Sequence, residues 1–159
     1  MRIAGIVDDS TVDGPGVRYT IFMQGCAHNC EGCHNPATHN YHGGGVLSFD
    51  QILADLSQHK YIKGVTFSGG EPLDQPEQLA ALIEELKTRG YHVVIFTGYR
   101  YEEVLQSPSK FAAAKQADIL IDGPYIAAQK TLNIPFRGSA NQRMIDMQAS
   151  IATGEVVEI

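Results

Sequence analysis

Long runs of one residue class are missing from this 159-residue sequence. No apolar stretch reaches the roughly 18 residues of a membrane-spanning helix, and Arg2, Asp8 and Asp9 place charges near the start. Basic residues are few: 12 Lys and Arg against 18 Asp and Glu give a net charge of −6, which leaves no basic surface to follow nucleic acid. No tract of Pro, Ser or Gly is long enough to be a linker. We therefore expect a single domain over residues 1–159, in the cytoplasm, that binds neither nucleic acid nor a membrane.

Cysteine is also scarce, and it is confined to one place. The sequence has three cysteines, all between positions 26 and 33. An odd number of cysteines in a chain without export features argues against a disulfide framework. Metal binding or redox chemistry is the better interpretation.

Periodic patterns predict strands that alternate with helices. The segment 17–24 is rich in β-branched and aromatic residues and indicates a buried strand. Ser48 and Gln51 form a capping box ahead of an amphipathic stripe that ends near Leu56. Further strands are expected over 65–68, 92–97 and 118–122, a weaker one over 143–147 and a short edge strand over 155–159. Further helices are expected after Pro72 up to Gly90, over 101–106 and over 110–117.

This alternation is typical of parallel βαβ units, and it places unusual residues at strand ends. A complete eight-unit barrel needs about 250 residues, so we expect an α/β fold in the form of a partial, open (βα) barrel of about five to six mostly parallel strands. Cys26, the pair Gly69-Gly70, Thr97-Gly98 and Asp122-Gly123 each follow a predicted strand. Ligands bind at that edge of parallel sheets, so these four strand ends predict one site.

The spacing of the cysteines favours an iron-sulfur cluster. Cys26, Cys30 and Cys33 form a C-x3-C-x2-C pattern in a loop, whereas a four-iron cluster ordinarily has four cysteine ligands. One iron would therefore stay open for another ligand. Two alternatives remain: three buried structural cysteines, or a zinc site with a histidine as fourth ligand. The candidates for that ligand are His28, His34, His39 and His42.

The cysteine pattern, joined to Ser-Gly-Gly-Glu-Pro at 68–72, resembles the radical S-adenosylmethionine superfamily. The resemblance implies that the three cysteines bind a [4Fe-4S] cluster whose open iron chelates S-adenosylmethionine. It also implies that Gly69 and Gly70 let backbone approach the methionine group and that Glu71 accepts from its ammonium group. The other candidate cofactor residues are Gly32, Cys33, His34, Ser68, Thr97 and Asp122. Gly32 replaces the aromatic residue that often stacks on adenine, so backbone near 32–34 or later strand ends would contact the adenine.

Three further motifs narrow the resemblance to activating enzymes of glycyl-radical enzymes. Asp-Gly-Pro-Gly-Val-Arg at 13–18 is similar to that branch. The motifs Asp-Gly-Pro-Tyr at 122–125 and Arg-Gly-Ser-Ala-Asn-Gln at 137–142 are similar to the small activating proteins of anaerobic ribonucleoside-triphosphate reductase. Taken singly, each motif is also an ordinary turn. Arg18 could be an ion-pair partner or part of a substrate surface, and the sequence leaves this open.

The resemblance implies a function. S-adenosylmethionine would be cleaved reductively to a 5′-deoxyadenosyl radical, which generates a glycyl radical on the anaerobic reductase. The electron would come from an external reductant such as flavodoxin or ferredoxin. The alternatives are an activase of another glycyl-radical enzyme, another radical enzyme of the superfamily, or a noncatalytic iron-sulfur or zinc protein.

Overall fold

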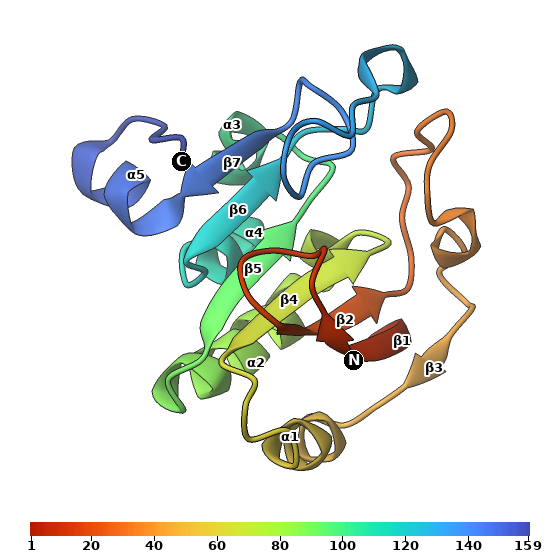
Figure 1. Cartoon of the computed structure of the whole chain (residues 1–159), viewed down its shortest axis with the longest axis vertical. Coiled ribbons are helices and arrows are strands. Elements are labelled where there is room, and N and C mark those ends of the chain that lie inside the picture. Colours follow the sequence, from red (N-terminus) through yellow and green to blue (C-terminus); the bar gives the residue numbers. More distant parts are fainter.

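The computed structural model describes all residues from 1 to 159 and is built on one seven-stranded sheet (Figure 1). The strand order across the sheet is β3-β1-β2-β4-β5-β6-β7. The strands are β1 (Arg2–Ser10), β2 (Arg18–Met23), β3 (Gly45–Val46), β4 (Gly64–Gly69), β5 (His92–Phe96), β6 (Ile119–Asp122) and β7 (Arg143–Asp146). The helices are α1 (Phe49–Ser57), α2 (Pro76–Thr88), α3 (Tyr101–Leu105), α4 (Pro108–Ala114) and α5 (Met147–Thr153), with 3-10 turns η1 (Pro36–Thr38), η2 (Pro72–Asp74) and η3 (Ala127–Gln129).

The sheet is mixed and open, so the α/β class is confirmed but a barrel is not. The pairs β2–β4, β4–β5 and β5–β6 are parallel, whereas β1–β2, β1–β3 and β6–β7 are antiparallel. The expectation of five to six mostly parallel strands therefore holds for the centre of the sheet and is wrong for its margins. The expected edge strand over 155–159 is reduced to one isolated bridge between Ile145 and Glu158.

Hydrophobic residues on the helices explain which face of the sheet they cover. Leu79, Leu82, Ile83 and Leu86 form one stripe of α2, and all four are buried in the main core of 26 residues. Helices α2, α3 and α4 lie behind the sheet in Figure 1. At the start of α1, Ser48 and Gln51 form the expected capping box. None of the helices is both long and apolar enough to cross a membrane.

The opposite face of the sheet has a smaller apolar cluster and is only partly covered. Its buried members are Val94, Ile119, Ile121 and Met144. The connection from β1 to β2, red in Figure 1, passes in front of this face. Because no helix covers it, this face leaves room for a cavity toward the carboxyl ends of the strands.

Arg18 fastens that connection to the sheet, which settles the role that the sequence left open. Its guanidinium is buried and donates to the carbonyl oxygens of Pro15 (2.9 Å), Val65 (2.9 Å) and His92 (3.0 Å). Its Nε also donates to Thr66 Oγ1 at 2.6 Å. Burial lowers the pKa of Arg18 to about 10. Arg18 thus acts as a clamp on backbone carbonyls, without a carboxylate partner.

Candidate functional site

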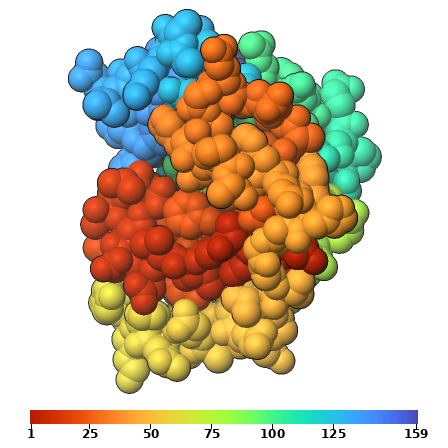
Figure 2. All heavy atoms as spheres, turned by 90° about the vertical axis from the view of Figure 1, so that its right-hand side faces the viewer, coloured from red at the N-terminus to blue at the C-terminus, as the bar shows by residue number.

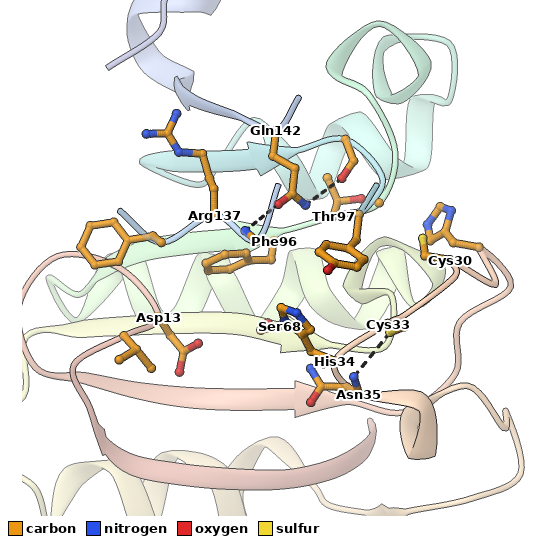
Figure 3. A pocket seen from close by; sticks show the side chains of 18 of the residues that line it. Asp13, Cys30, Cys33, His34, Asn35, Ser68, Phe96, Thr97, Arg137 and Gln142 are labelled. Carbon is orange, nitrogen blue, oxygen red and sulfur yellow. Dashed lines mark hydrogen bonds between the residues drawn. The ribbon is translucent and has the colours of Figure 1, made fainter. Parts of the chain in front are cut away.

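A cavity of ≈ 590 Å³ opens at the carboxyl ends of the parallel strands. Figure 3 looks into it: Arg137 and Gln142 lie on one side, Asp13 lies on the other, and Cys30 and Cys33 lie at one end. In Figure 2 the orange segment that carries the cysteines lies beside the blue residues beyond 120 and the red N-terminal residues. Segments far apart in the sequence therefore build one site.

Most of the residues singled out from the sequence line this cavity. They are Cys26, Cys30, Cys33, His34, Ser68, Gly69, Gly70 and Thr97. Gly32, Glu71 and Asp122 are not among the lining residues. The convergence predicted from the sequence thus holds for all four strand ends. The fourth, after β6, borders the cavity through Gly123 and not through Asp122.

The thiol groups have the chemistry of cluster ligands and share one cavity. All three cysteines are free and partly exposed. No group of three His, Cys, Asp or Glu side chains is drawn together as the ligand set of a single metal ion. Burial, with smaller contributions from Glu71 and Asp74, raises the pKa of Cys26 to about 11. Because a thiol binds iron as thiolate, ligation by Cys26 would release a proton.

Gly69, the last residue of β4, and Gly70 allow close contact between protein backbones. A Cβ on Gly70 would lie 2.5 Å from the carbonyl oxygen of Gly25, and one on Gly69 would lie 2.7 Å from the amide nitrogen of Met23. Gly69 also has φ +86°, where a side chain is strained. The amide of Gly70 donates to Met23 O at 2.9 Å, and the amide of Glu71 donates to Gly25 O at 2.8 Å. These contacts bring the base of the cysteine loop against the turn after β4.

Glu71 is fully buried and its carboxylate is occupied by protein groups. Oε1 accepts from Thr97 Oγ1 (2.8 Å) and from the amide of Leu73 (3.0 Å). Oε2 accepts from the amide of Gly98 (2.8 Å) and lies 2.6 Å from His28 Nε2. The hydrogen bond to Glu71 raises the pKa of His28, although burial opposes this. In this structure Glu71 therefore links protein segments and does not face the cavity.

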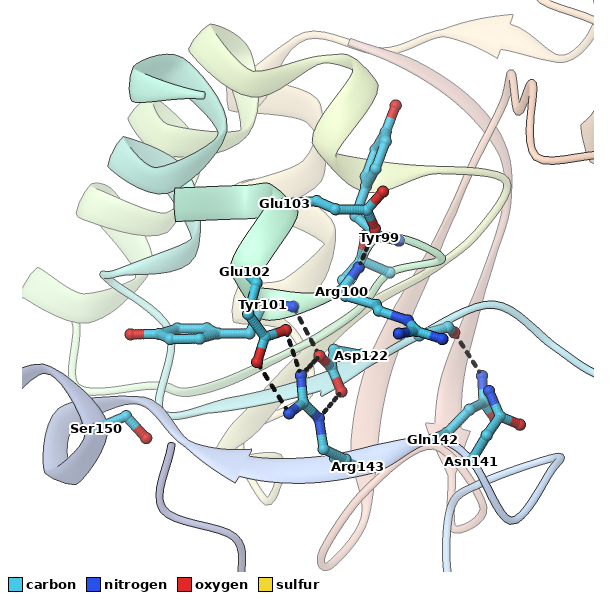
Figure 4. Close-up of polar contacts among 12 residues, drawn as sticks. Tyr99, Arg100, Tyr101, Glu102, Glu103, Asp122, Asn141, Gln142, Arg143 and Ser150 are labelled. Atoms are coloured by element: carbon cyan, nitrogen blue, oxygen red, sulfur yellow. Dashed lines mark hydrogen bonds and ion pairs between the residues drawn. The ribbon is translucent and has the colours of Figure 1, made fainter. Parts of the chain in front are cut away.

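The carboxylate of Asp122 is likewise occupied by donors from the protein (Figure 4). It is buried, accepts from Arg143 Nε at 3.0 Å and from the amide of Tyr101 at 2.7 Å. Arg143 also donates to Glu102 at 2.8 Å. The hydrogen bond to Asp122, followed in size by the one to Glu102, raises the pKa of the Arg143 guanidinium above its ordinary value. The ion pair holds β6, β7 and α3 together next to the cavity.

Residues between 123 and 142 form one wall of the cavity, which the sequence analysis did not predict. Gln142 Oε1 accepts from the amides of Gly138 (2.9 Å) and Ser139 (3.2 Å), and its Nε2 donates to Gly123 O (3.1 Å). Asn141 donates to Pro124 O at 2.7 Å. The two motifs at 122–125 and 137–142 therefore pair with each other. Tyr125 and Arg137, one from each motif, line the cavity, and the lining residues that the sequence did not single out include Phe22, Phe96, Lys130 and Phe136.

Comparison with known proteins identifies relatives of this chain. A family model described as a 4Fe-4S single cluster domain matches residues 12–145. An anaerobic ribonucleoside-triphosphate reductase-activating protein of Enterobacteria phage T4 is 35% identical over 139 residues, which cover 84% of this chain and 86% of that protein. A protein of the same name from Vibrio cholerae is 36% identical over 140 residues, or 82% and 88% of the two chains. The chain belongs to this family.

A second kind of activating enzyme is also similar. The pyruvate formate-lyase-activating enzyme of Clostridium pasteurianum is 45% identical over 114 residues. These cover 66% of this chain but only 48% of that enzyme. Membership of the activating-protein family confirms the resemblance drawn from the motifs and the single four-iron cluster expected from the cysteines.

Proposed function

We propose that this protein activates an anaerobic ribonucleoside-triphosphate reductase by generating a glycyl radical on it. The supporting observation is a cavity at the ends of β2, β4 and β5, lined by the three thiols of the loop after β2, in a chain whose relatives are named for this activity. Its cofactors are a [4Fe-4S] cluster and S-adenosylmethionine, and an external one-electron reductant such as flavodoxin or ferredoxin supplies the electron. Residues 1–159 act as a single radical S-adenosylmethionine domain.

The lining residues suggest how the cavity is divided. Cys26, Cys30 and Cys33 hold the cluster at one end, and the turn 68–70 with Thr97 adjoins it. His34, which lines the cavity next to the third cysteine, borders the place for adenine, and we assign the backbone of Gly32 to the same place. When bound, the cofactors would relay the reductant's electron and supply a carbon-centred radical that can remove a hydrogen atom from the partner's glycine. The protein contributes binding, orientation and exclusion of water.

Glu71 and Asp122 contribute by positioning. Both carboxylates are buried and already accept from protein donors. Glu71 joins the turn after β4 to the loop after β5, and Asp122 joins β6 to β7 and α3. These contacts hold the strand ends that border the cofactor.

The proposal is tested with anaerobically reconstituted protein, reductant and S-adenosylmethionine. We expect about four irons per chain and formation of 5′-deoxyadenosine, both lost when any of Cys26, Cys30 or Cys33 is replaced by Ala. With the reductase added, electron paramagnetic resonance should show a doublet split by the remaining glycine α-hydrogen. A partner whose radical glycine is changed to alanine is the matched control. Cleavage of S-adenosylmethionine without a protein radical would contradict the activase proposal.

A second candidate partner is favoured by one observation. The 45% identity to a pyruvate formate-lyase-activating enzyme exceeds the identity to the reductase activators, although it spans a shorter segment. The same resonance experiment with pyruvate formate-lyase in place of the reductase separates the two candidates. We expect the larger radical yield with the reductase, because its activators match over most of both chains.

A further inference from the structure

A buried carboxylate joins the cysteine loop to the other loops of the cavity. Glu71 has no exposed surface, and its two oxygens accept from Leu73, Thr97 and Gly98. The fourth partner is His28, whose Nε2 lies 2.6 Å from Glu71 Oε2. Because a carboxylate oxygen accepts, the imidazole donates. The fourth contact therefore comes from the segment between Cys26 and Cys30.

The imidazole of His28 fits a slot formed by the loop after β5. Its ring lies edge-on to the ring of Tyr99, with centroids 4.5 Å apart. Gly98 leaves room for it, since a Cβ there would lie 2.5 Å from the imidazole. Tyr99 is itself fixed, because its hydroxyl donates to Asp74 at 2.7 Å. Packing on two sides thus sets the direction in which His28 reaches Glu71.

His28 is the one residue of 27–32 whose side chain makes a hydrogen bond. The loop is otherwise held near its ends. At its start, the amide of Gly25 donates to Thr38 O at 2.7 Å and the amide of Cys26 donates to His39 O at 3.2 Å. At its end, Cys33 Sγ accepts from the amide of Asn35 at 3.4 Å and contacts His39 Nε2 at 3.3 Å. Without His28, the stretch that carries Cys30 would have no side-chain hydrogen bond to the strand-end loops.

We propose that His28 is a positioning residue that, through Glu71, fixes the cysteine loop onto the two loops that border the cofactor. The inference rests on the proposed function, in which Cys26, Cys30 and Cys33 hold the cluster. It assigns Glu71 to anchoring the cluster loop. Cluster and cofactor are then held in a fixed relation, because the anchor joins both of their binding segments.

Three variants test the anchor. His28→Phe keeps the ring in the slot beside Tyr99 but removes the donor to Glu71. His28→Gln restores a donor, since its side-chain nitrogen is as many bonds from Cα as Nε2 of histidine. His42→Phe is the matched control: it lies in the same segment, is exposed, and its side chain makes no hydrogen bond.

The loaded enzymes are compared by three readouts. Outer contacts of metal ligands commonly change affinity about 10- to 100-fold, so His28→Phe should lose iron to a chelator at least about tenfold faster. Its KM for S-adenosylmethionine should rise by a larger factor than its kcat falls, because the cofactor segment is displaced relative to the cluster. The resonance signal of the reduced cluster should respond less to added S-adenosylmethionine. His28→Gln should recover most of each effect, and His42→Phe should match the parent.

The apo-protein gives an independent readout. The amides of Leu73 and Gly98 donate to Glu71, so their hydrogen exchange should quicken in His28→Phe and not in His42→Phe. Equal exchange and equal iron loss in these two variants would overturn the anchor. If the parent itself took up no iron, the proposed function would fail, and the amide exchange would still decide the anchor. Should His28→Phe not fold, His28→Asn, which is too short to reach Glu71, replaces it.

Discussion

At the scale of single residues, the two glycines at the end of β4, Gly69 and Gly70, are explained by contact between protein backbones. A side chain on Gly70 would point at the carbonyl oxygen of Gly25, the residue before the first cysteine. The sequence suggested a different reason, namely room for the cofactor's methionine group. Both reasons require glycine, but they predict different consequences of a substitution.

We expect Gly70→Val to destabilise the apo-protein and to impair cluster loading as well as cofactor binding. Its Cβ would lie 2.5 Å from Gly25 O, so either the turn or the cysteine loop must shift. Overpacking of this kind costs about 1–3 kcal/mol, measurable by urea unfolding. Gly5→Ala is the control, because a Cβ there meets nothing within 4 Å. A Gly70→Val protein that unfolds like its parent would contradict the backbone explanation.

Two histidines predict opposite effects of pH on stability. Burial and the charge of Arg18 lower the pKa of His92 below its ordinary value of 6.5, whereas the bond to Glu71 raises that of His28. As pH falls below 6.5, the unfolded chain binds a proton at His92 before the folded protein does, so stability falls. As pH rises above 6.5, the unfolded chain releases the proton of His28 before the folded protein does, so stability falls in that direction too.

The test is urea unfolding of the apo-protein at pH values from 5 to 8. Between pH 5 and 6.5, His92→Gln should flatten the rise of unfolding free energy with pH, by at most about 1.4 kcal/mol per pH unit. The slope above pH 6.5 should persist, because it belongs to His28. An unchanged slope below pH 6.5 in the variant would show that His92 titrates normally in the folded protein.

At the scale of elements, the connection between β1 and β2 depends on one side chain. Arg18 donates to three carbonyl oxygens and to Thr66, and Thr66 Oγ1 in turn donates to Asp13 O at 2.7 Å. An ammonium group cannot reproduce this planar set of donors. The side chain therefore ties residues 13–15 to the starts of β4 and β5.

Arg18→Lys should lower the unfolding free energy by about 2–4 kcal/mol, because buried carbonyl groups lose their donors. Thermal and urea unfolding measure the change. Arg89→Lys is the control: Arg89 is exposed and pairs with Glu85 one turn away, a contact worth less than about 0.5 kcal/mol. Similar losses in both variants would argue against the clamp.

The elements that the sequence predicted are those with strong periodicity. The central strands and α2 bury continuous or regularly spaced apolar residues, which local patterns reveal. Strand β1 was missed because its last residues, Asp8, Asp9 and Ser10, are polar and break the apolar pattern of a strand. Its pairing with β2 also shifts register at two points. Helix α5 was missed because it is short and buries only Met147 and Ser150, so it has no apolar stripe that a local pattern could reveal.

The same limit applies to the site. The cysteines and the turn after β4 are contiguous motifs, so the sequence places them at strand ends. The hydrogen bond from His28 to Glu71 joins residues 43 positions apart, and no local pattern encodes it. The motifs at 122–125 and 137–142 were noticed, but their pairing depends on the antiparallel return of β7 beside β6.

At the scale of the whole molecule, the fold and the cluster segment are built separately. The main core of 26 residues and the smaller cluster of four contain no residue from 24–46. That segment is held by hydrogen bonds and by packing such as that of Tyr41 on Gly25. The sheet with its helices therefore has its stabilising contacts without the cluster.

We expect the apo-protein to stay folded, with local rather than global loss of order when iron is removed. A ligand bound only by the folded state raises stability, so the loaded protein should have the higher Tm. After chelation, hydrogen exchange should quicken over residues 26–42 and at residues 70 and 71 of the turn after β4. The amides of β4, β5 and α2 should remain protected, because they belong to the buried core. The triple variant in which Cys26, Cys30 and Cys33 are serine is the control, since it should match the chelated parent without treatment. Loss of protection throughout the sheet on chelation would mean that the cluster is required for folding, and that the division between core and cluster segment is wrong.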